Sequence, residues 1–241
     1  MEQVACLQII SQFLEYPEQP LWDMKADVEE AIDSLIFLSP AQKDALYAFY
    51  ESLLENDVLD AQSEYTELFD RGRSLSLLLF EHVHGESRDR GQAMVDLMNQ
   101  YQQAGLEIDS KELPDFLPLY LEYLSVQGRD KAVEGLKDIA PILALLGARL
   151  KERNSLYSLL FDVLLSFSNS GVKASMLAKE VESEDRDDTP QALDAVWEEE
   201  QVKFMGEEGC ASAQQVAHQK RFSGSVQPQY INIDSLSGDK S

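Results

Sequence analysis

Apolar residues recur along most of the first 180 positions at the spacing of amphipathic helices. One stripe lies at i, i+3, i+4 and i+7, which is one face of a helix, and consists of Leu117, Tyr120, Leu121 and Leu124. Alternation typical of strands is nearly absent, and only residues 229–233 hint at an extended segment. We therefore predict an all-α protein with about eight helices before residue 180, packed as a single-domain helical bundle.

Proline and glycine punctuate these segments where helices would begin and end. Ser39–Pro40 and Thr189–Pro190 each combine a capping residue with proline at the first helical position, which is typical of a helix start. Pro141 is expected near another helix start or at a kink, because a proline inside a helix costs about 3 kcal/mol. Gly105 and Gly128 lie where C-terminal caps are expected.

The character of the sequence changes near residue 180. Residues 181–188 are a run of acids with little apolar content, which is typical of a linker. Residues 190–204 restore one amphipathic helix, which carries Trp197 and Phe204. We therefore divide the chain into a helical domain at 1–180, an acidic linker and amphipathic helix at 181–205, and a flexible tail at 206–241.

The charge is concentrated in two segments. The 241 residues are 44% apolar and include 44 acidic and 20 basic residues, for a net charge of −24. Residues 1–70 carry −14 and residues 180–208 carry −10, whereas residues 71–179 are nearly balanced. Such a surface repels phosphate backbones and anionic lipid, so we expect neither nucleic acid nor a membrane surface as partner. The two segments are either solvated faces or a surface that attracts a basic peptide.

The cysteines and the apolar runs bear on the compartment. Cys6 and Cys210 belong to no CxxC pair, which argues against a disulfide scaffold and against zinc chemistry. The N-terminus has no basic region before an apolar run, so we expect no signal peptide. The apolar stretch at 139–148 is far shorter than the roughly 20 residues that cross a bilayer. We expect a cytoplasmic protein without membrane insertion.

Residues 71–91 hold the highest density of reactive side chains. His82 and His84 would point roughly 200° apart on a helix and lack further ligands, so we expect no metal site. Four arginines of this segment either hold a phosphate or carboxylate bidentately or pair with neighbouring acids; they are Arg71, Arg73, Arg88 and Arg90. The chain has no nucleophile-elbow, metalloprotease or kinase motif, so we predict that it is not an enzyme.

Residues 112–124 combine two prolines with acidic and aromatic residues around a predicted helix start. Asp115 is placed to cap the N–H groups of the first turn. One interpretation is a helix entry that serves folding alone. The other is a rigid rim beside a groove between helices, which suits an amphipathic or basic peptide.

Four long stretches of the chain resemble the TorD-like redox-enzyme maturation proteins. Within that family, the resemblance is to the molybdenum-cofactor assembly chaperones of bacterial respiratory nitrate reductase. The stretches are Tyr65–Arg73, Leu77–Leu97, Gly135–Leu146 and Asp187–Phe204. Runs of this length are far more specific than a short motif, so the resemblance implies a TorD-like helical fold.

Two motifs of the wider family mark candidate residues for binding a client peptide. Its aromatic-x-x-Leu-Phe pattern falls on Tyr65, Leu68 and Phe69. Its Glu-x-Pro-Asp-His pattern falls on Glu112, Pro114 and Asp115. Phe116 stands where histidine is usual, which removes a titratable donor.

The resemblance implies a chaperone for the catalytic (alpha) subunit of respiratory nitrate reductase. Similar proteins bind the N-terminal segment of that subunit and hold the apoenzyme off its membrane anchor until the molybdenum cofactor is inserted. This implies no permanently bound cofactor, room for a transient contact with molybdopterin guanine dinucleotide, and molybdenum cofactor biosynthesis proteins as further partners. An alternative hypothesis makes the chain itself a carrier that holds a phosphorylated molybdopterin or nucleotide through the four arginines named above.

Overall fold

The computed structural model describes residues 4–83, 88–108 and 112–198. The chain divides into two compact units, residues 1–189 and residues 190–241. Within the second unit, residues 190–198 are described as helical, and Val196 and Trp197 are exposed. The predicted tail at 206–241 and the predicted extended segment at 229–233 lie outside the described residues.

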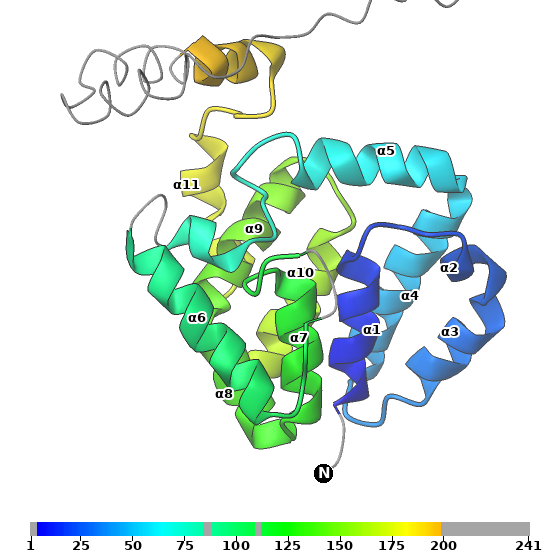
Figure 1. The fold of residues 1–241 in the computed structure, drawn as a ribbon. Helices are drawn as coiled ribbons and strands as arrows, with labels where there is room; N and C mark the ends of the chain where they lie inside the picture. Colours follow the sequence, from blue (N-terminus) through cyan, green and yellow to red (C-terminus); the bar gives the residue numbers. More distant parts are fainter. Residues whose placement is uncertain (1–3, 84–87, 109–111, 199–241) are drawn as a thin grey trace, which may run out of the picture. The chain divides into compact units, whose positions relative to one another are not determined.

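The first unit is all-α over its described residues, which confirms the predicted fold class (Figure 1). The elements are α1 (Ala5–Leu14), α2 (Pro20–Asp23), α3 (Lys25–Asp33), α4 (Pro40–Glu55), α5 (Val58–Phe69), η1 (Leu79–His82), α6 (Arg88–Gln103), α7 (Leu117–Val126), α8 (Arg129–Asp138), α9 (Ala140–Glu152), α10 (Ser158–Ser168), η2 (Ala174–Met176) and α11 (Ala178–Glu182). They outnumber the about eight that we predicted, because elements of one turn, such as α2 and α11, are too short to show an amphipathic repeat. No helix in these ranges is long and apolar enough to span a membrane.

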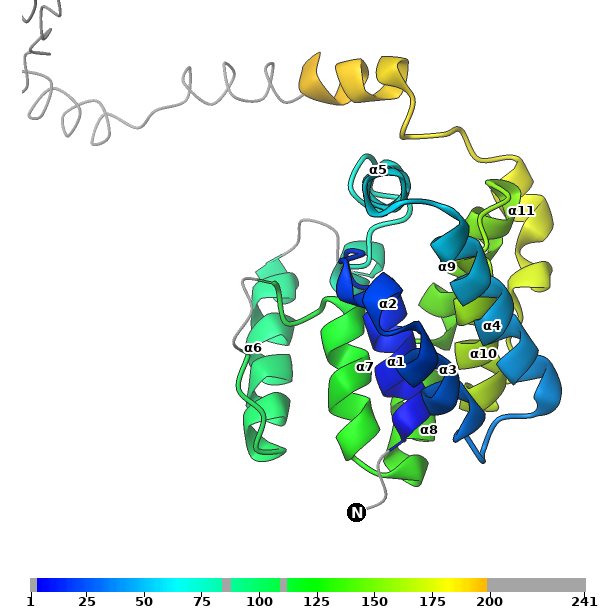
Figure 2. The same cartoon turned by 90° about the vertical axis from the view of Figure 1, so that its right-hand side faces the viewer.

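The first helix packs against a helix from the middle of the chain. α1 and α7 lie side by side in the views of Figures 1 and 2. The Ser11 hydroxyl of α1 donates to the carbonyl of Pro118 in α7 over 2.8 Å, and the N–H of Val4 donates to the carbonyl of Ser125 over 2.8 Å. These two bonds fix α1 at both ends against α7.

A second group of helices surrounds α10, which contacts α9, α8 and α4. Its inward side chains are fully buried, and they include Leu160, Phe161 and Leu164. α7 and α8 approach closely at Gly135, where a Cβ would lie 2.5 Å from Cδ2 of Leu124. The close contact between these two helices is therefore formed by Leu124 of α7 and Gly135 of α8.

Several helix ends confirm the predictions made from proline and glycine. Ser39 caps α4 with a capping box, in which the side chains of Ser39 and Gln42 each accept from the other's backbone N–H. Pro141 lies in the first turn of α9. Gly105 has φ 77° just after α6, and the next residue's N–H donates to the carbonyl of Tyr101 over 2.9 Å, as in a C-terminal cap.

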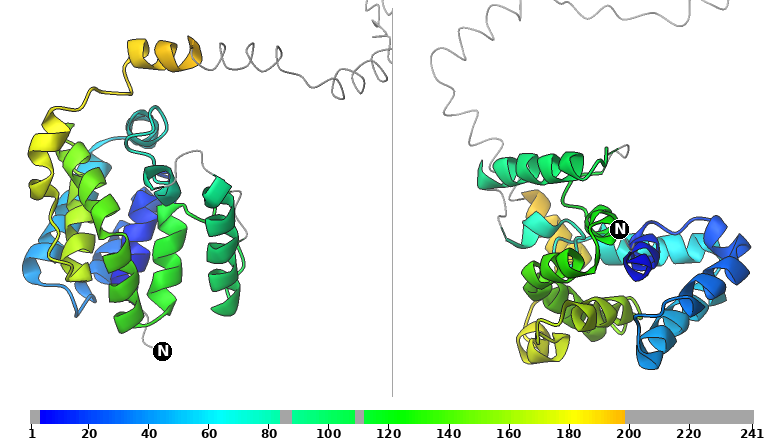
Figure 3. Two further views of the ribbon diagram at one scale, coloured as in Figure 1. Left: turned by 90° about the vertical axis from the view of Figure 1, so that its left-hand side faces the viewer. Right: turned by 90° about the horizontal axis from the view of Figure 1, so that it is seen from below.

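α5 and α6 lie at the margins of this unit. α5 crosses the ends of the upright helices (Figure 1), and α6 stands alongside α7 (Figures 2 and 3). Tyr101 anchors α6, because its ring lies 5.0 Å from that of Tyr123 and its hydroxyl donates to the carbonyl of Pro114 over 2.7 Å. Val95 and Met98 of α6 remain exposed.

Candidate functional site

The aromatic-x-x-Leu-Phe motif lies on α5 and faces the core. Tyr65 and Phe69 are both buried, with ring centroids 4.8 Å apart. Phe69 meets Tyr157 edge-on at 5.0 Å, and the hydroxyl of Tyr65 donates to the carbonyl of Leu14 over 2.9 Å. Leu68 is half-buried and packs against the same core. Burial raises the pKa of Tyr65, so its hydroxyl stays protonated and acts as a donor.

Asp115 of the second motif is fully buried, and it does not cap α7 as we had expected. Its Oδ2 accepts from the N–H of Phe80 over 3.0 Å, whereas the N-cap of α7 is Phe116, which makes no side-chain cap. The backbone carbonyl of Asp115 also accepts from the N–H of Leu79 over 2.9 Å. The expectation was wrong because Oδ2 bonds to a backbone N–H of η1 instead of one in the first turn of α7. Asp115 therefore ties the loop before α7 to η1.

An arginine from α6 approaches this buried carboxylate. Arg90 NH2 lies 3.8 Å from Oδ2 of Asp115, and its NH1 lies 3.6 Å from the carboxylate of Glu81. Burial raises the pKa of Asp115, although the Phe80 N–H and the Arg90 charge oppose that rise. Among the described residues, Oδ1 of Asp115 accepts no hydrogen bond. Arg90, Glu81 and Asp115 therefore connect α6, η1 and the loop before α7.

The remaining residues of this motif differ in exposure. Glu112 is exposed, Pro114 is buried and Phe116 is half-buried against the core. Together with Asp115, they form the entry to α7, and Glu112 is open to solvent there. A direct contact of these residues with a client peptide stays a prediction.

Two of the arginines of residues 71–90 contact different acids. Arg71, which lies just after α5, pairs with Glu67 of that helix at 3.6 Å, and Arg90 pairs with Glu81 and Asp115 as above. Arg73 also has interactions within the fold. The side chain of Arg88 lies outside the described residues. A shared anion site for the four stays a prediction.

His82 is half-buried, and its Nε2 lies 2.8 Å from the carbonyl of Ser76. Burial lowers its pKa, which favours the neutral ring. His84 lies outside the described residues. Over the described ranges, no three side chains of the metal-binding types converge on one point.

A groove that the sequence did not indicate runs between α1 and the segment formed by α2 and α3. Its cavity volume is about 600 Å³, and its walls are largely apolar; they include Ile9, Phe13, Tyr16, Leu21, Met24 and Val28. Met24 is 50% exposed and Tyr16 is 46% exposed, so an apolar surface is open to solvent here. A groove of this size and composition can take several apolar side chains of a peptide.

The groove has an acidic end. Glu15 and Glu18 both line it. Burial raises the pKa of Glu15 to about 7, and the negative charges of Glu122, Glu112 and Glu18 add to that rise. Glu112, a residue of the second motif, therefore contributes to the negative potential at the groove. A cation brought to this end would be attracted by several carboxylates.

Tyr65 lies directly behind the wall of the groove. The ring of Tyr16 meets that of Tyr65 edge-on at 5.6 Å. Tyr65 also holds the end of α1 through Leu14. The first motif thus fixes the position of a groove residue, while its own aromatic rings stay inside.

Comparison with known proteins matches residues 25–162 to the family model of the nitrate reductase delta subunit. The chain belongs to this family. It is 58% identical over 94% of its length to the nitrate reductase molybdenum cofactor assembly chaperone NarJ of Escherichia coli, of which the match covers 96%. It is 52% identical over 96% of its length to a second Escherichia coli protein, the probable chaperone NarW, of which 98% is covered. A probable NarJ of Bacillus subtilis is 30% identical over 69% of this chain and 90% of its own length.

The matches fit the resemblance found in the sequence. The delta-subunit family model covers both motifs and all four arginines of residues 71–90, because it runs from α3 into α10. The match to NarJ extends over nearly the whole chain. This member of the delta-subunit family is therefore a maturation chaperone of the NarJ type.

Proposed function

We propose that this chaperone acts on the catalytic (alpha) subunit of respiratory nitrate reductase. It binds the N-terminal segment of the apo subunit and keeps the subunit competent for molybdenum cofactor insertion before membrane anchoring. The names of its relatives support the assembly role. The groove beside α1 supports the binding of a peptide segment.

The observation that carries the proposal is an apolar groove with an acidic end. A helical segment with an apolar face would bury that face against Ile9, Met24 and Val28. A basic residue at one end of the segment would lie near Glu15 and Glu18. The first 70 residues carry a net charge of −14, so they would also steer a basic segment toward the groove.

The residues predicted from the motifs have supporting roles in this proposal. Tyr65 and Phe69 hold the core behind the groove, and Tyr65 positions Tyr16. Glu112 adds negative charge near Glu15. The client thus contacts the groove, and the motif residues hold the wall of that groove in place.

The proposal places the chaperone in the cytoplasm and gives it no catalytic step. The chain holds no permanent cofactor, and a contact with molybdopterin guanine dinucleotide is transient, during insertion into the client. Proteins of molybdenum cofactor biosynthesis are further partners at that stage. No enzyme motif in the sequence opposes this reading.

Isothermal titration of the full chain with a synthetic peptide of the subunit's N-terminal segment tests the proposal. Met24→Ser should weaken binding about tenfold or more, because a buried methionine contributes about 1.5–3 kcal/mol. Met176→Ser is the matched control, since Met176 is 66% exposed and lies on η2, outside the groove residues. This control should bind as tightly as the unchanged chain.

Two outcomes would contradict the proposal. One is the absence of measurable binding to the unchanged chain. The other is an equal affinity of the two methionine variants, which would place the peptide elsewhere. Circular dichroism of both variants confirms that they are folded before the affinities are compared.

A further inference from the structure

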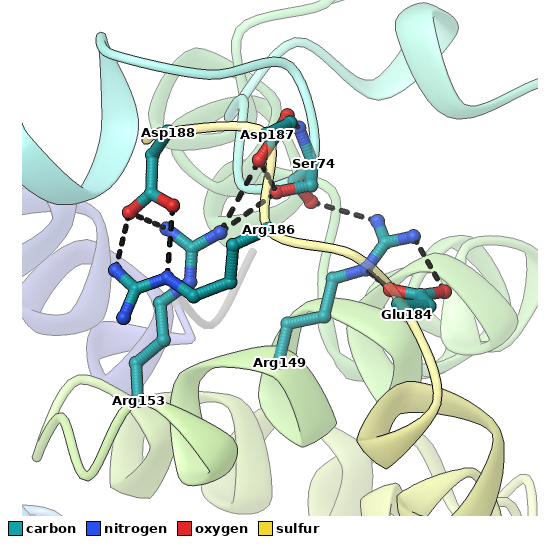
Figure 4. A network of polar contacts seen from close by, with 7 residues as sticks. All are labelled: Ser74, Arg149, Arg153, Glu184, Arg186, Asp187 and Asp188. Atoms are coloured by element: carbon teal, nitrogen blue, oxygen red, sulfur yellow. Dashed lines mark hydrogen bonds and ion pairs between the residues drawn. The ribbon is translucent and has the colours of Figure 1, made fainter. Parts of the chain in front are cut away.

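The last segment of the first unit folds back over the loop after α5. We name residues 183–189 the acidic strap. Three of its carboxylates meet Arg149 of α9, the C-cap residue Arg153 of the same helix and the loop residue Ser74 (Figure 4). They belong to Glu184, Asp187 and Asp188. The strap contacts a loop that lies 113 positions earlier in the chain.

Asp187 sits in a cradle of donors. Its Oδ2 accepts from the backbone N–H of Ser74 over 2.7 Å, and its Oδ1 accepts from the Ser74 hydroxyl over 2.5 Å. Oδ1 also accepts from NH2 of Arg153 over 3.3 Å. A Cβ at Gly72 would lie 2.8 Å from this carboxylate, so glycine leaves the space that the anion fills.

Both arginines are oriented by Ser74 as well as by the strap. NH1 of Arg149 donates to the carbonyl of Ser74 over 2.8 Å, and NH2 of Arg153 donates to the Ser74 hydroxyl oxygen over 2.9 Å. Arg149 lies in the last turn of α9, and Arg153 is the C-cap residue four positions later. The bonds to Ser74 would therefore hold both arginines in place if the strap moved away.

The strap neutralises these arginines with its own carboxylates. Arg149 donates through Nε and Nη2 to the two carboxylate oxygens of Glu184, over 2.7 and 2.9 Å. NH1 of Arg153 donates to Asp188 over 3.1 Å. Burial would raise the pKa of Asp187, but hydrogen bonds from Ser74 and the Arg153 charge outweigh it and hold that pKa below its usual range. The cradle thus favours an anion.

The strap is well placed to open locally. The side chain of Asp187 is 34% exposed, whereas that of Arg153 is only 10% exposed. Thr189 is the last residue of the first unit, so the strap is the end segment of that unit. Segments at the end of a compact unit open at low free energy, and opening of this one would expose the pair of Asp188 with Arg153, whose side chains are 8% and 10% exposed. The arginines belong to the rigid body, and the carboxylates belong to the part that opens.

A cavity already exists beside these groups. Its volume is about 160 Å³, and it is lined by Ser74, Arg149, Arg153 and Arg186 together with the carboxylates of Glu152, Glu182, Glu184 and Asp185. Two guanidinium forks, a serine hydroxyl and a backbone N–H supply more donors than Asp187 alone uses, and Glu184 and Asp188 of the strap take donors of the two forks. A phosphate group offers three or more acceptor oxygens in a tetrahedral arrangement, and arginine forks suit it well.

We propose that Ser74, Arg149 and Arg153 form a binding site for a phosphate group, which Asp187 of the acidic strap occupies as an internal substitute. The ligand class is a free phosphate, a pyrophosphate or the phosphate of a nucleotide. Ligand and strap compete for the same donors, so phosphate binding releases the strap. This site is separate from the groove, and the inference does not rest on peptide binding.

The test uses the full chain with the strap carboxylates neutralised by Glu184→Gln, Asp187→Asn and Asp188→Asn. Inorganic phosphate, pyrophosphate and a nucleoside monophosphate are compared with acetate and chloride at equal ionic strength. At saturating concentration, one or more phosphate ligands should raise the melting temperature of this variant by about 3 °C or more. The unchanged chain should bind the same ligand at least tenfold more weakly by isothermal titration, because its own carboxylates compete.

Two arginine variants in the same background locate the site. Arg153→Gln should abolish the shift, and Arg71→Gln should preserve it, since Arg71 pairs with Glu67 on α5. If the triple variant does not fold, Asp187→Asn alone takes its place, since it removes one charge without changing the shape of the side chain. Phosphate ligands should again raise the melting temperature of this variant, and they should again bind it more tightly than the unchanged chain. Equal shifts with acetate or chloride, no shift with any phosphate ligand, or a shift that survives Arg153→Gln would each overturn the proposal. The three phosphate ligands separate a site for the free anion from one for a nucleotide.

Discussion

The hydroxyl of Tyr65 donates to the backbone carbonyl of Leu14 over 2.9 Å, between two residues that are 51 positions apart. Leu14 is the last residue of α1, so its carbonyl has no partner within that helix. The bond therefore completes the end of α1 and joins it to α5. It also brings the ring of Tyr65 against Tyr16 at the wall of the groove.

Tyr65→Phe should lower the free energy of unfolding by about 1–2 kcal/mol, because it leaves a buried carbonyl without its donor. Urea unfolding followed by circular dichroism measures the change. Tyr16→Phe is the matched control, since Tyr16 is exposed, and we expect a change below about 0.5 kcal/mol. Equal losses in the two variants would show that the Leu14 bond contributes nothing of its own.

Gly135→Ala should destabilise the fold by about 1–3 kcal/mol, because the new methyl group would overlap Leu124 of α7. In an exposed helix the same change usually stabilises by up to about 1 kcal/mol, so the sign itself is informative. Gly91→Ala in α6 is the control, since nothing lies within 4 Å of a Cβ there. Thermal unfolding of the two variants should move in opposite directions, and a stabilised Gly135→Ala would refute close packing of α7 on α8.

Glu15→Gln should stabilise the fold more at pH 8 than at pH 4. Burial and the surrounding carboxylates raise the pKa of Glu15 from 4.5 to about 7, so the folded state favours the neutral acid. The stability from this preference is present below the unfolded pKa of about 4.3 and is lost as pH rises through about 7. Glutamine stays neutral, so the advantage of the variant should grow over that interval. After solvent screening we expect about 1–2 kcal/mol at pH 8.

Urea unfolding at pH 4, 6 and 8 measures the effect of Glu15→Gln. Glu51→Gln serves as control, because Glu51 is an exposed residue of α4 outside the groove. Its effect should not follow the same pH profile. A constant difference between Glu15→Gln and the unchanged chain from pH 4 to pH 8 would contradict a raised pKa.

Gly72→Ala should displace the acidic strap, because its methyl group would lie 2.8 Å from the carboxylate of Asp187. We expect faster amide hydrogen exchange across residues 183–189 and at Ser74, and a loss of about 1 kcal/mol in stability. Hydrogen exchange measured by mass spectrometry resolves these segments. Exchange in α10 should stay unchanged. Unchanged exchange across residues 183–189 would contradict the prediction, because the loop would then accommodate the methyl group without displacing the strap.

The sequence was a good guide to the helices, but it left open what the motifs do. A period of 3.6 residues identifies each long helix, since one face must be buried. The same burial explains the first motif, because Tyr65 and Phe69 lie on the inner face of α5. A strongly patterned aromatic motif thus marked packing behind a site, and the pattern alone cannot separate that role from peptide contact.

The groove and the strap could not be predicted, for a geometric reason. The groove exists because the chain reverses between α1 and α2, which brings Met24 and Val28 opposite Ile9. Apolar periodicity indicates that each helix has an inner face, but it does not specify the angle between two helices. The arginines at the C-terminal end of α9 drew no attention in the sequence, because their partner acids lie about 35 positions downstream.

The return of the strap to Ser74 also sets an order on biosynthesis. A chain leaves the ribosome from its N-terminus and folds progressively, so α1 must wait for α7, and the loop at Ser74 must wait for Asp187. The cradle therefore closes only when nearly the whole first unit has been translated. Until then Arg149 and Arg153 lack their carboxylates, and a nascent chain presents them as free cations.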